Sequence, residues 1–158
     1  MYRKILVPLD GSHVAEGVLP HAKALAYSEG AEMILLTVGA NPALDFAFSD
    51  PGIAQRAVEE QEERSKKYIS EIEEQLKAEG FRVSTLLRVG SVADVILGVA
   101  DELKVDVIAM STHGRTGAAR WFLGSIAERV VHSSKVPVLL IRATEEKAAK
   151  RRAKSKNA

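Results

Sequence analysis

The segment from Val105 to Val131 places the strongest constraint on how this chain can fold. It opens with a short apolar run that is partly β-branched, which is typical of a strand covered on both faces. Polar residues and glycines follow, and Ser125 with Glu128 then gives the S-x-x-E pattern of a helical capping box. The segment therefore predicts a buried strand, a glycine-bearing loop that opens at Ser111, and a helix that begins at Ser125.

This strand–loop–helix segment has the properties of a phosphate-binding site. The first backbone N–H groups of a helix have no intrahelical partner and carry the positive end of the helix dipole. Gly124 lets an anion approach the backbone without a Cβ in the way. The same residues also occur in loops that serve only turn geometry and helix capping. A phosphate cradle and a plain connection are therefore both open interpretations at this point.

Composition indicates one globular domain and excludes several classes of site. The chain has 158 residues, of which 46% are apolar and 27% charged, so it is long enough for a full-sized core. It contains no cysteine, which excludes disulfides and thiolate metal sites and suits a reducing cytoplasm. No apolar run approaches the roughly 20 residues that span a bilayer, and the N-terminal run is too short for a secretory signal. We therefore expect a cytoplasmic protein with no membrane partner.

The net charge of +1 is unevenly distributed along the chain. From Glu145 onward there are six lysines and arginines and two glutamates, so this tail carries +4 and residues 1–144 carry −3. The body is therefore not a basic nucleic-acid surface, and nucleic acid is not an expected partner. We expect a domain over residues 1–143 and a basic, disordered tail over residues 144–158. Binding of nucleic acid or an acidic partner by that tail stays open as an alternative.

Strand-like patterns alternate with helical patterns along the whole domain. We expect strands at 5–9, 31–38, 81–89, 105–110 and 136–141, and helices up to about 27, at 53–79, at 91–103 and from 125. Pro20 predicts a kink in the first helix or a restart after a loose first turn. Gly30 and Gly80 predict helix ends. Ser91 with Asp94 predicts a second capping box.

This alternation predicts an α/β fold. We expect a single-domain, open, five-stranded parallel sheet of order 3-2-1-4-5 with helices on both faces, a Rossmann-like arrangement. In that order the loops after the first and fourth strands meet in one crevice at the switch point of the sheet. Asp10 follows the first strand there, and its carboxylate can accept hydrogen bonds from ribose hydroxyls. The alternative is that Asp10 caps the next helix.

The last predicted strand has the features of a sheet edge. Pro137 cannot donate a hydrogen bond to a neighbouring strand, which favours an edge position. An apolar edge strand promotes aggregation unless it is covered or paired. We therefore expect a homodimer through the strand from Val136 to Ile141.

Four motifs in this order and spacing resemble those of the universal stress protein family. They read ILVPLDGS at the start, GSVADVIL and MSTHGRTG in the middle, and LGSIAERVVHSSKVPVLLIR at the end of the domain. ATP-binding members of that family carry G-x2-G-x9-G-[ST], which Gly114 and Gly124–Ser125 match here. Ser111 stands in the place of the first motif glycine. The resemblance implies ATP bound between strands 1 and 4, with Mg²⁺ bridging its phosphates, and a homodimer through the last strand.

The resemblance also implies roles for individual residues. Pro8 and Asp10 are expected near base and ribose, and Val38 at the adenine. The remaining expected contacts are Met110 and Ser111 to the nucleotide, and Gly114, Gly124, Ser125 and Ile126 to the phosphates. His113 is expected to orient the loop or to contact phosphate. The expected function is therefore that of a cytoplasmic stress-response or regulatory protein that binds ATP.

Two other functions stay open. The sequence contains no P-loop, H-E-x-x-H or G-x-S-x-G motif, so we assign no catalytic residue and no dedicated metal site. An enzymatic role would be limited to slow ATP hydrolysis or autophosphorylation, for which Ser125 is the first candidate. The other alternative is a protein-interaction module of the same fold that binds no nucleotide, which the departure at Ser111 keeps open.

Overall fold

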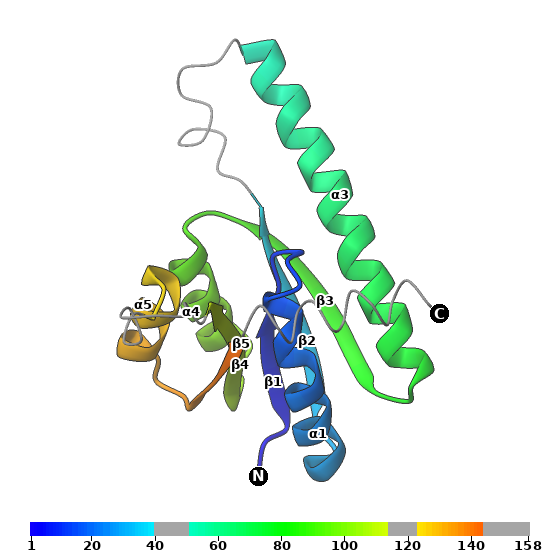
Figure 1. Cartoon of the computed structure of the whole chain (residues 1–158), viewed down its shortest axis with the longest axis vertical. Helices are drawn as coiled ribbons and strands as arrows, with labels where there is room; N and C mark the ends of the chain where they lie inside the picture. Colours follow the sequence, from blue (N-terminus) through cyan, green and yellow to red (C-terminus); the bar gives the residue numbers. More distant parts are fainter. Residues whose placement is uncertain (40–50, 114–122, 144–158) are drawn as a thin grey trace.

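The computed structural model describes residues 1–39, 51–113 and 123–143, and it contains one sheet with helices around it (Figure 1). The elements in chain order are β1 (Lys4–Pro8), η1 (Ala15–Val18), α1 (Leu19–Glu29), β2 (Glu32–Gly39), α3 (Pro51–Ala78), β3 (Arg82–Val89), α4 (Val92–Glu102), β4 (Val107–His113), α5 (Ser125–Ser133) and β5 (Val138–Ala143). No helix in these ranges combines the length and apolar character that a membrane crossing needs. Gly114 and the tail from residue 144 lie outside the described residues.

The sheet confirms the predicted fold class. Its strands are parallel and lie in the order β3-β2-β1-β4-β5. Figure 1 shows α1 and α3 on one side of the sheet and α4 and α5 on the other. The order reverses direction beside β1, so the carboxyl ends of β1 and β4 lie next to each other at the switch point.

Side chains of alternate residues in each strand contribute to two separate cores. On one face Ile5 and Val7 pack in a cluster with residues of α1 and α3, such as Ala22 and Ile69. On the other face Leu6 packs in a cluster with residues of α4 and α5. Because both faces are covered, the interiors of β1 and β2 are nearly continuous apolar runs rather than alternating ones.

The start of the first helix resolves the alternatives at Pro20. A short 3-10 turn, η1, comes first, and α1 then begins at Leu19 with Pro20 in its first turn. Proline is tolerated there because the first N–H groups of a helix have no intrahelical acceptor. The helix therefore restarts rather than kinks. It ends at Gly30, whose φ of 61° is left-handed, as predicted.

Neither predicted capping box forms. Ser91 is the N-cap of α4, but its side chain makes no capping hydrogen bond. Helix α5 begins at Ser125 as predicted, but its N-cap is Gly124, so Ser125 lies one position inside the helix. The first helical bond runs from Glu128 N to Gly124 O at 2.9 Å. A capping box depends on the backbone conformation of one residue, which the four-residue pattern does not determine.

The fourth strand is longer than predicted, and the fifth is displaced. We expected a polar loop from Ser111, but β4 continues to His113, with Ser111 opposite Ile141 and Thr112 opposite Arg142 in β5. Strand β5 begins at Val138, two residues after the predicted start, and runs to Ala143. The polar residues join the strand because ladder bonds are made by the backbone. The edge position is confirmed, since β5 lies at the end of the strand order.

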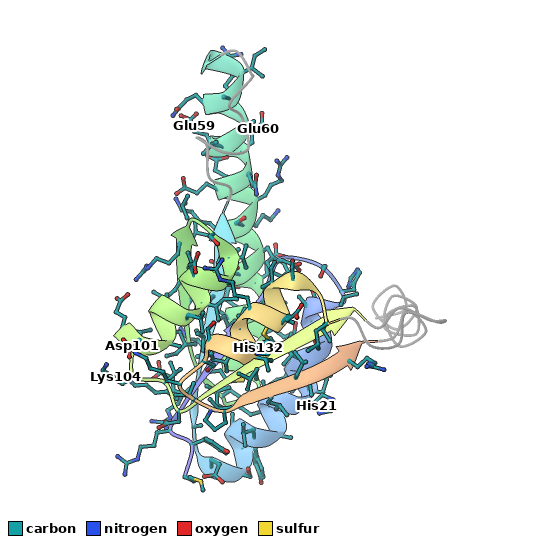
Figure 2. The ribbon with its side chains drawn as sticks, turned by 90° about the vertical axis from the view of Figure 1, so that its left-hand side faces the viewer. His21, Glu59, Glu60, Asp101, Lys104 and His132 are labelled. Atoms are coloured by element: carbon teal, nitrogen blue, oxygen red, sulfur yellow. The ribbon has the colours of Figure 1, made fainter. Side chains whose placement is uncertain are left out.

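Helix α3 reaches well past the sheet. It has 28 residues, and its buried side chains, Ile69 and Leu76, lie in its C-terminal half. Figure 1 shows the N-terminal part projecting beyond the sheet, and Figure 2 places Glu59 and Glu60 on that part. The pair of Glu62 Oε1 and Lys66 Nζ, 2.6 Å apart, is one of its i,i+4 ion pairs. Such pairs support an exposed helix by a few tenths of a kcal/mol each, about 0.2–0.5.

Candidate functional site

A cleft opens at the carboxyl ends of β1 and β4, where the predicted crevice lies. Its cavity volume is about 250 Å³. Of the residues predicted for the site, those that line it are Pro8, Asp10, Val38, Met110, Ser111, Gly124, Ser125 and Ile126. The side chain of His113 and the whole of Gly114 lie outside the described residues. The structure therefore brings the predicted residues together, while their contact with a nucleotide stays a prediction.

Asp10 belongs to a turn between β1 and η1. Its Oδ1 accepts a hydrogen bond from Ser12 N at 2.9 Å, and Ser12 Oγ accepts one from Ala15 N at 3.1 Å. Gly11 between them has a φ of 82°, a conformation that side-chain-bearing residues rarely adopt. Ser12, and not Asp10, therefore provides the side-chain hydrogen bond at the start of η1. Asp10 is exposed, and in the described part of the chain its Oδ2 makes no hydrogen bond.

The N-terminus of α5 forms another part of the cleft wall. Its N-cap Gly124 has no side chain, and no side chain of the described residues caps the helix start. Gly124 has an ordinary φ of −58°, and a Cβ built there would meet no atom within 4 Å. Neither backbone strain nor packing within the described structure therefore requires glycine at this position. The space above it is open, and the N–H groups of the first helical turn border it.

Another part of the cleft wall is apolar. It is built by residues that belong to the core on the α4 and α5 face of the sheet: Leu36, Val38, Val92, Ile96 and Met110. Such a wall suits a planar aromatic ring, because binding removes apolar surface of both partners from water. Asp10 is the one charged side chain among the described residues that line the cleft. Backbone N–H groups and hydroxyl groups, and not side-chain cations, are thus the anion donors that the described lining offers.

Helix α3 is linked to the turn beside the cleft. Tyr68 on α3 donates a hydrogen bond from its hydroxyl to Glu16 Oε1 in η1 at 3.2 Å. Burial raises the pKa of Tyr68 well above its usual value, and the nearby carboxylates of Glu16 and Asp10 raise it further. The phenol is therefore held in its neutral, hydrogen-bonding form at physiological pH.

Several lining residues were missed by sequence reasoning. They are Leu9, Ser12, Val14, Ala15, Leu36, Val92, Ile96, Thr112 and Ala127. Leu36 was recognisable in the sequence only as a core residue, because its place at the rim depends on the register with Pro8. Ser12 had a usable signal, since it follows Asp10 in the predicted switch-point loop. Among the described residues, no group of three or more histidine or acidic side chains is arranged to hold a metal ion.

Comparison with known proteins gives one family. Residues 1–142 match the model of the Universal stress protein family. The Universal stress protein MJ0577 of Methanocaldococcus jannaschii is 34% identical over 155 residues, which covers 90% of this chain and 96% of the relative. The solved structure of MJ0577 has a TM-score of 0.76 at 32% identity, covering 90% of this chain and 97% of the other. A universal stress protein solved in complex with cAMP has a TM-score of 0.64 at 25% identity, covering 89% and 97%.

Proposed function

Because this chain belongs to the universal stress protein family, we propose that it is a stress-response protein whose ligand is ATP, bound in the cleft between β1 and β4. The observation that carries the proposal is a meeting of three surfaces in one cleft. An apolar wall, the Asp10 carboxylate and the N-terminus of α5 border the same space; among the described residues, one carboxylate oxygen makes no hydrogen bond and no side chain caps the helix. Each suits a different part of a nucleotide.

The adenine would pack on the apolar wall that includes Val38 and Met110. Asp10 Oδ2 would accept a hydrogen bond from a ribose hydroxyl, while Oδ1 keeps its bond to Ser12 N. The first N–H groups of α5 would donate to the phosphates, and the helix dipole favours negative charge at that end. Mg²⁺ would bridge phosphate oxygens as it does for free ATP, held by the nucleotide more than by the protein. The related protein solved with cAMP supports an adenine nucleotide as the ligand class.

The role proposed for ATP is regulatory. Ligand contacts to β1, β4 and α5 would join elements that are far apart in the sequence, so binding would change how firmly they are held together. No residue is assigned a catalytic role.

A homodimer through β5 is part of the proposal. The strand lies at the edge of the sheet, and its apolar residues from Val138 to Ile141 are only half-buried in the single chain. Pairing with a second copy would cover these side chains and satisfy the edge backbone groups. Sedimentation equilibrium tests this: a mass of two chains is expected, and a single-chain mass at every concentration would contradict it.

The test of the nucleotide site begins with the purified protein. Mass spectrometry of nucleotide released on denaturation, followed by calorimetric titration with ATP and Mg²⁺, should reveal bound ATP or micromolar binding. Gly124→Ala should weaken that binding because its Cβ enters the space next to the helix N-terminus. Gly98→Ala in α4 is the matched control, because its Cβ also meets no atom within 4 Å and Gly98 does not line the cleft. Absence of released nucleotide together with no heat from ATP, ADP or AMP would contradict the proposal.

A further inference from the structure

Within residues 1–39, 51–113 and 123–143, two buried hydroxyl groups have no hydrogen-bond partner: Thr37 Oγ1 and Ser111 Oγ. An unpaired buried hydroxyl destabilises the fold, so a native protein rarely retains one without a use for it. Thr37 is in β2 and Ser111 is in β4, the two strands on either side of β1. The two hydroxyl groups differ in their position relative to the cleft.

The sheet register places both hydroxyls in one row. Pro8 lies opposite Leu36, so the next row places Leu9 beside Thr37. On the other side of β1, Ile5 lies opposite Val107 of β4. The same register, continued along both strands to Leu9, places Ser111 beside Leu9. Because side chains alternate along a strand, Thr37 and Ser111 belong to the sheet face that α1 and α3 cover.

Only Ser111 of these two residues lines the cleft. Thr37 is 4% exposed and does not contribute to the lining. The lining also includes Asp10 and Ser12, which come from the turn after β1. No hydrogen bond to a described residue holds the Ser111 hydroxyl in its rotamer, so rotation about Cα–Cβ can bring it to a ligand in the cleft.

We propose that Ser111 is a specificity residue: its hydroxyl and the Asp10 carboxylate together bind the two sugar hydroxyls of the nucleotide, so that the cleft selects ribose over deoxyribose. This inference rests on the proposed function of the same cleft. The base is assigned to the apolar wall and the phosphates to the N-terminus of α5, which leaves the sugar for the part of the lining that Ser111 and Asp10 contribute. Asp10 Oδ2 accepts a hydrogen bond from one sugar hydroxyl. Ser111 Oγ donates a hydrogen bond to the other sugar hydroxyl or accepts one from it.

The experiment compares ATP, 2′-deoxy-ATP and 3′-deoxy-ATP by calorimetry on the full chain. The wild-type protein should bind ATP more tightly than each deoxynucleotide, by about fivefold or more. Ser111→Ala should lose about fivefold in ATP affinity and should no longer discriminate against one of the two deoxynucleotides. Thr37→Val removes the other unpaired hydroxyl of the row and is the matched control, which should keep the wild-type affinity ratios. Thermal unfolding of each variant checks that it is folded.

The outcomes separate this inference from the function on which it rests. Nucleotide binding by wild type with unchanged ratios in Ser111→Ala would overturn the role of Ser111 and leave the ATP site standing. An equal loss for all three nucleotides would likewise overturn it, because a sugar contact cannot weaken a ligand that lacks the hydroxyl concerned. Failure of wild type to bind any of the three would overturn both proposals.

Discussion

Arg129 Nη2 lies 2.5 Å from Asp94 Oδ1, which joins the first turn of α4 to α5 by an ion pair. Both side chains are more than half exposed, at 57% for Arg129 and 52% for Asp94. The sequence pattern had assigned Asp94 to a capping box within its own helix. The structure uses it instead to connect two helices on the same face of the sheet, and this difference can be measured.

A double-mutant cycle distinguishes the two roles of Asp94. Asp94→Asn should lower the free energy of unfolding by less than about 1 kcal/mol, because exposed ion pairs are weak. The loss should nearly disappear in an Arg129→Gln background, since the partner is then already absent. Urea unfolding of the four proteins gives the coupling. A loss that is independent of residue 129 would favour the helix cap and contradict the ion pair.

Thr37→Val should stabilise the protein. Thr37 is 4% exposed and its Oγ1 has no hydrogen-bond partner in the described part of the chain, so an isosteric methyl group removes an unpaired buried hydroxyl at constant volume. The expected gain in the free energy of unfolding is about 1 kcal/mol, measured by urea unfolding. Thr85→Val in β3 is the matched control, because Thr85 Oγ1 donates to Glu73 Oε2 at 3.2 Å and its loss should destabilise. A gain in both variants would indicate strand propensity and not desolvation.

The contribution of Asp106 to stability should depend on pH. Its Oδ2 accepts the backbone N–H groups of Lys4 at 2.9 Å and Arg3 at 2.7 Å, and these hydrogen bonds lower the pKa of Asp106. Because the folded pKa lies below the unfolded value of about 3.9, the stabilisation is complete above that value. It is lost as the pH falls through the folded pKa.

Asp106→Asn should therefore cost less than about 1 kcal/mol at pH 7, because solvent screens this exposed carboxylate, and progressively less below pH ~4. Urea unfolding of wild type and variant at several pH values measures the difference. An equal loss at all pH values would mean that the carboxylate charge contributes nothing.

Tyr68 should give the protein a stability that decreases at alkaline pH. Burial, and next the Glu16 carboxylate, raise the pKa of Tyr68 above its usual value of about 10. The unfolded chain loses the phenolic proton first, so stability falls as the pH rises above ~10. In Tyr68→Phe, the free energy of unfolding should no longer show this fall above pH ~10. The absorbance titration of the tyrosines should also lose the step that occurs at the highest pH. An unchanged late component would assign it to another tyrosine.

The fold could be predicted because its signals are local. Buried strands such as β1 are continuous apolar runs, and Gly30 stops a helix by its own backbone conformation. Parallel order and handedness then follow from general rules of chain connection. The extension of β4 through Ser111 could not be predicted, because it depends on pairing with Ile141 in a strand that follows much later.

The site was predictable in outline and not in its contacts. Asp10 was identified because the switch point fixes where the strand ends meet, whereas Val38 was expected only from the resemblance to the family. The unpaired hydroxyl of Ser111 and the bond from Ser12 N to Asp10 depend on register and turn geometry, which a one-dimensional pattern does not contain.

The glycine at the start of α5 has a consequence for how a bound anion could be sensed. A helix of nine residues without a side-chain cap frays easily at its first turn. A phosphate bound at that end would take the place of the missing cap, so site occupancy would appear as slower amide exchange in α5. The chain passes directly from α5 through Ser134 and Pro137 into the edge strand β5. The effect of nucleotide binding would then reach β5 at the edge of the sheet as a change in local rigidity, and the shape of the sheet would not need to change.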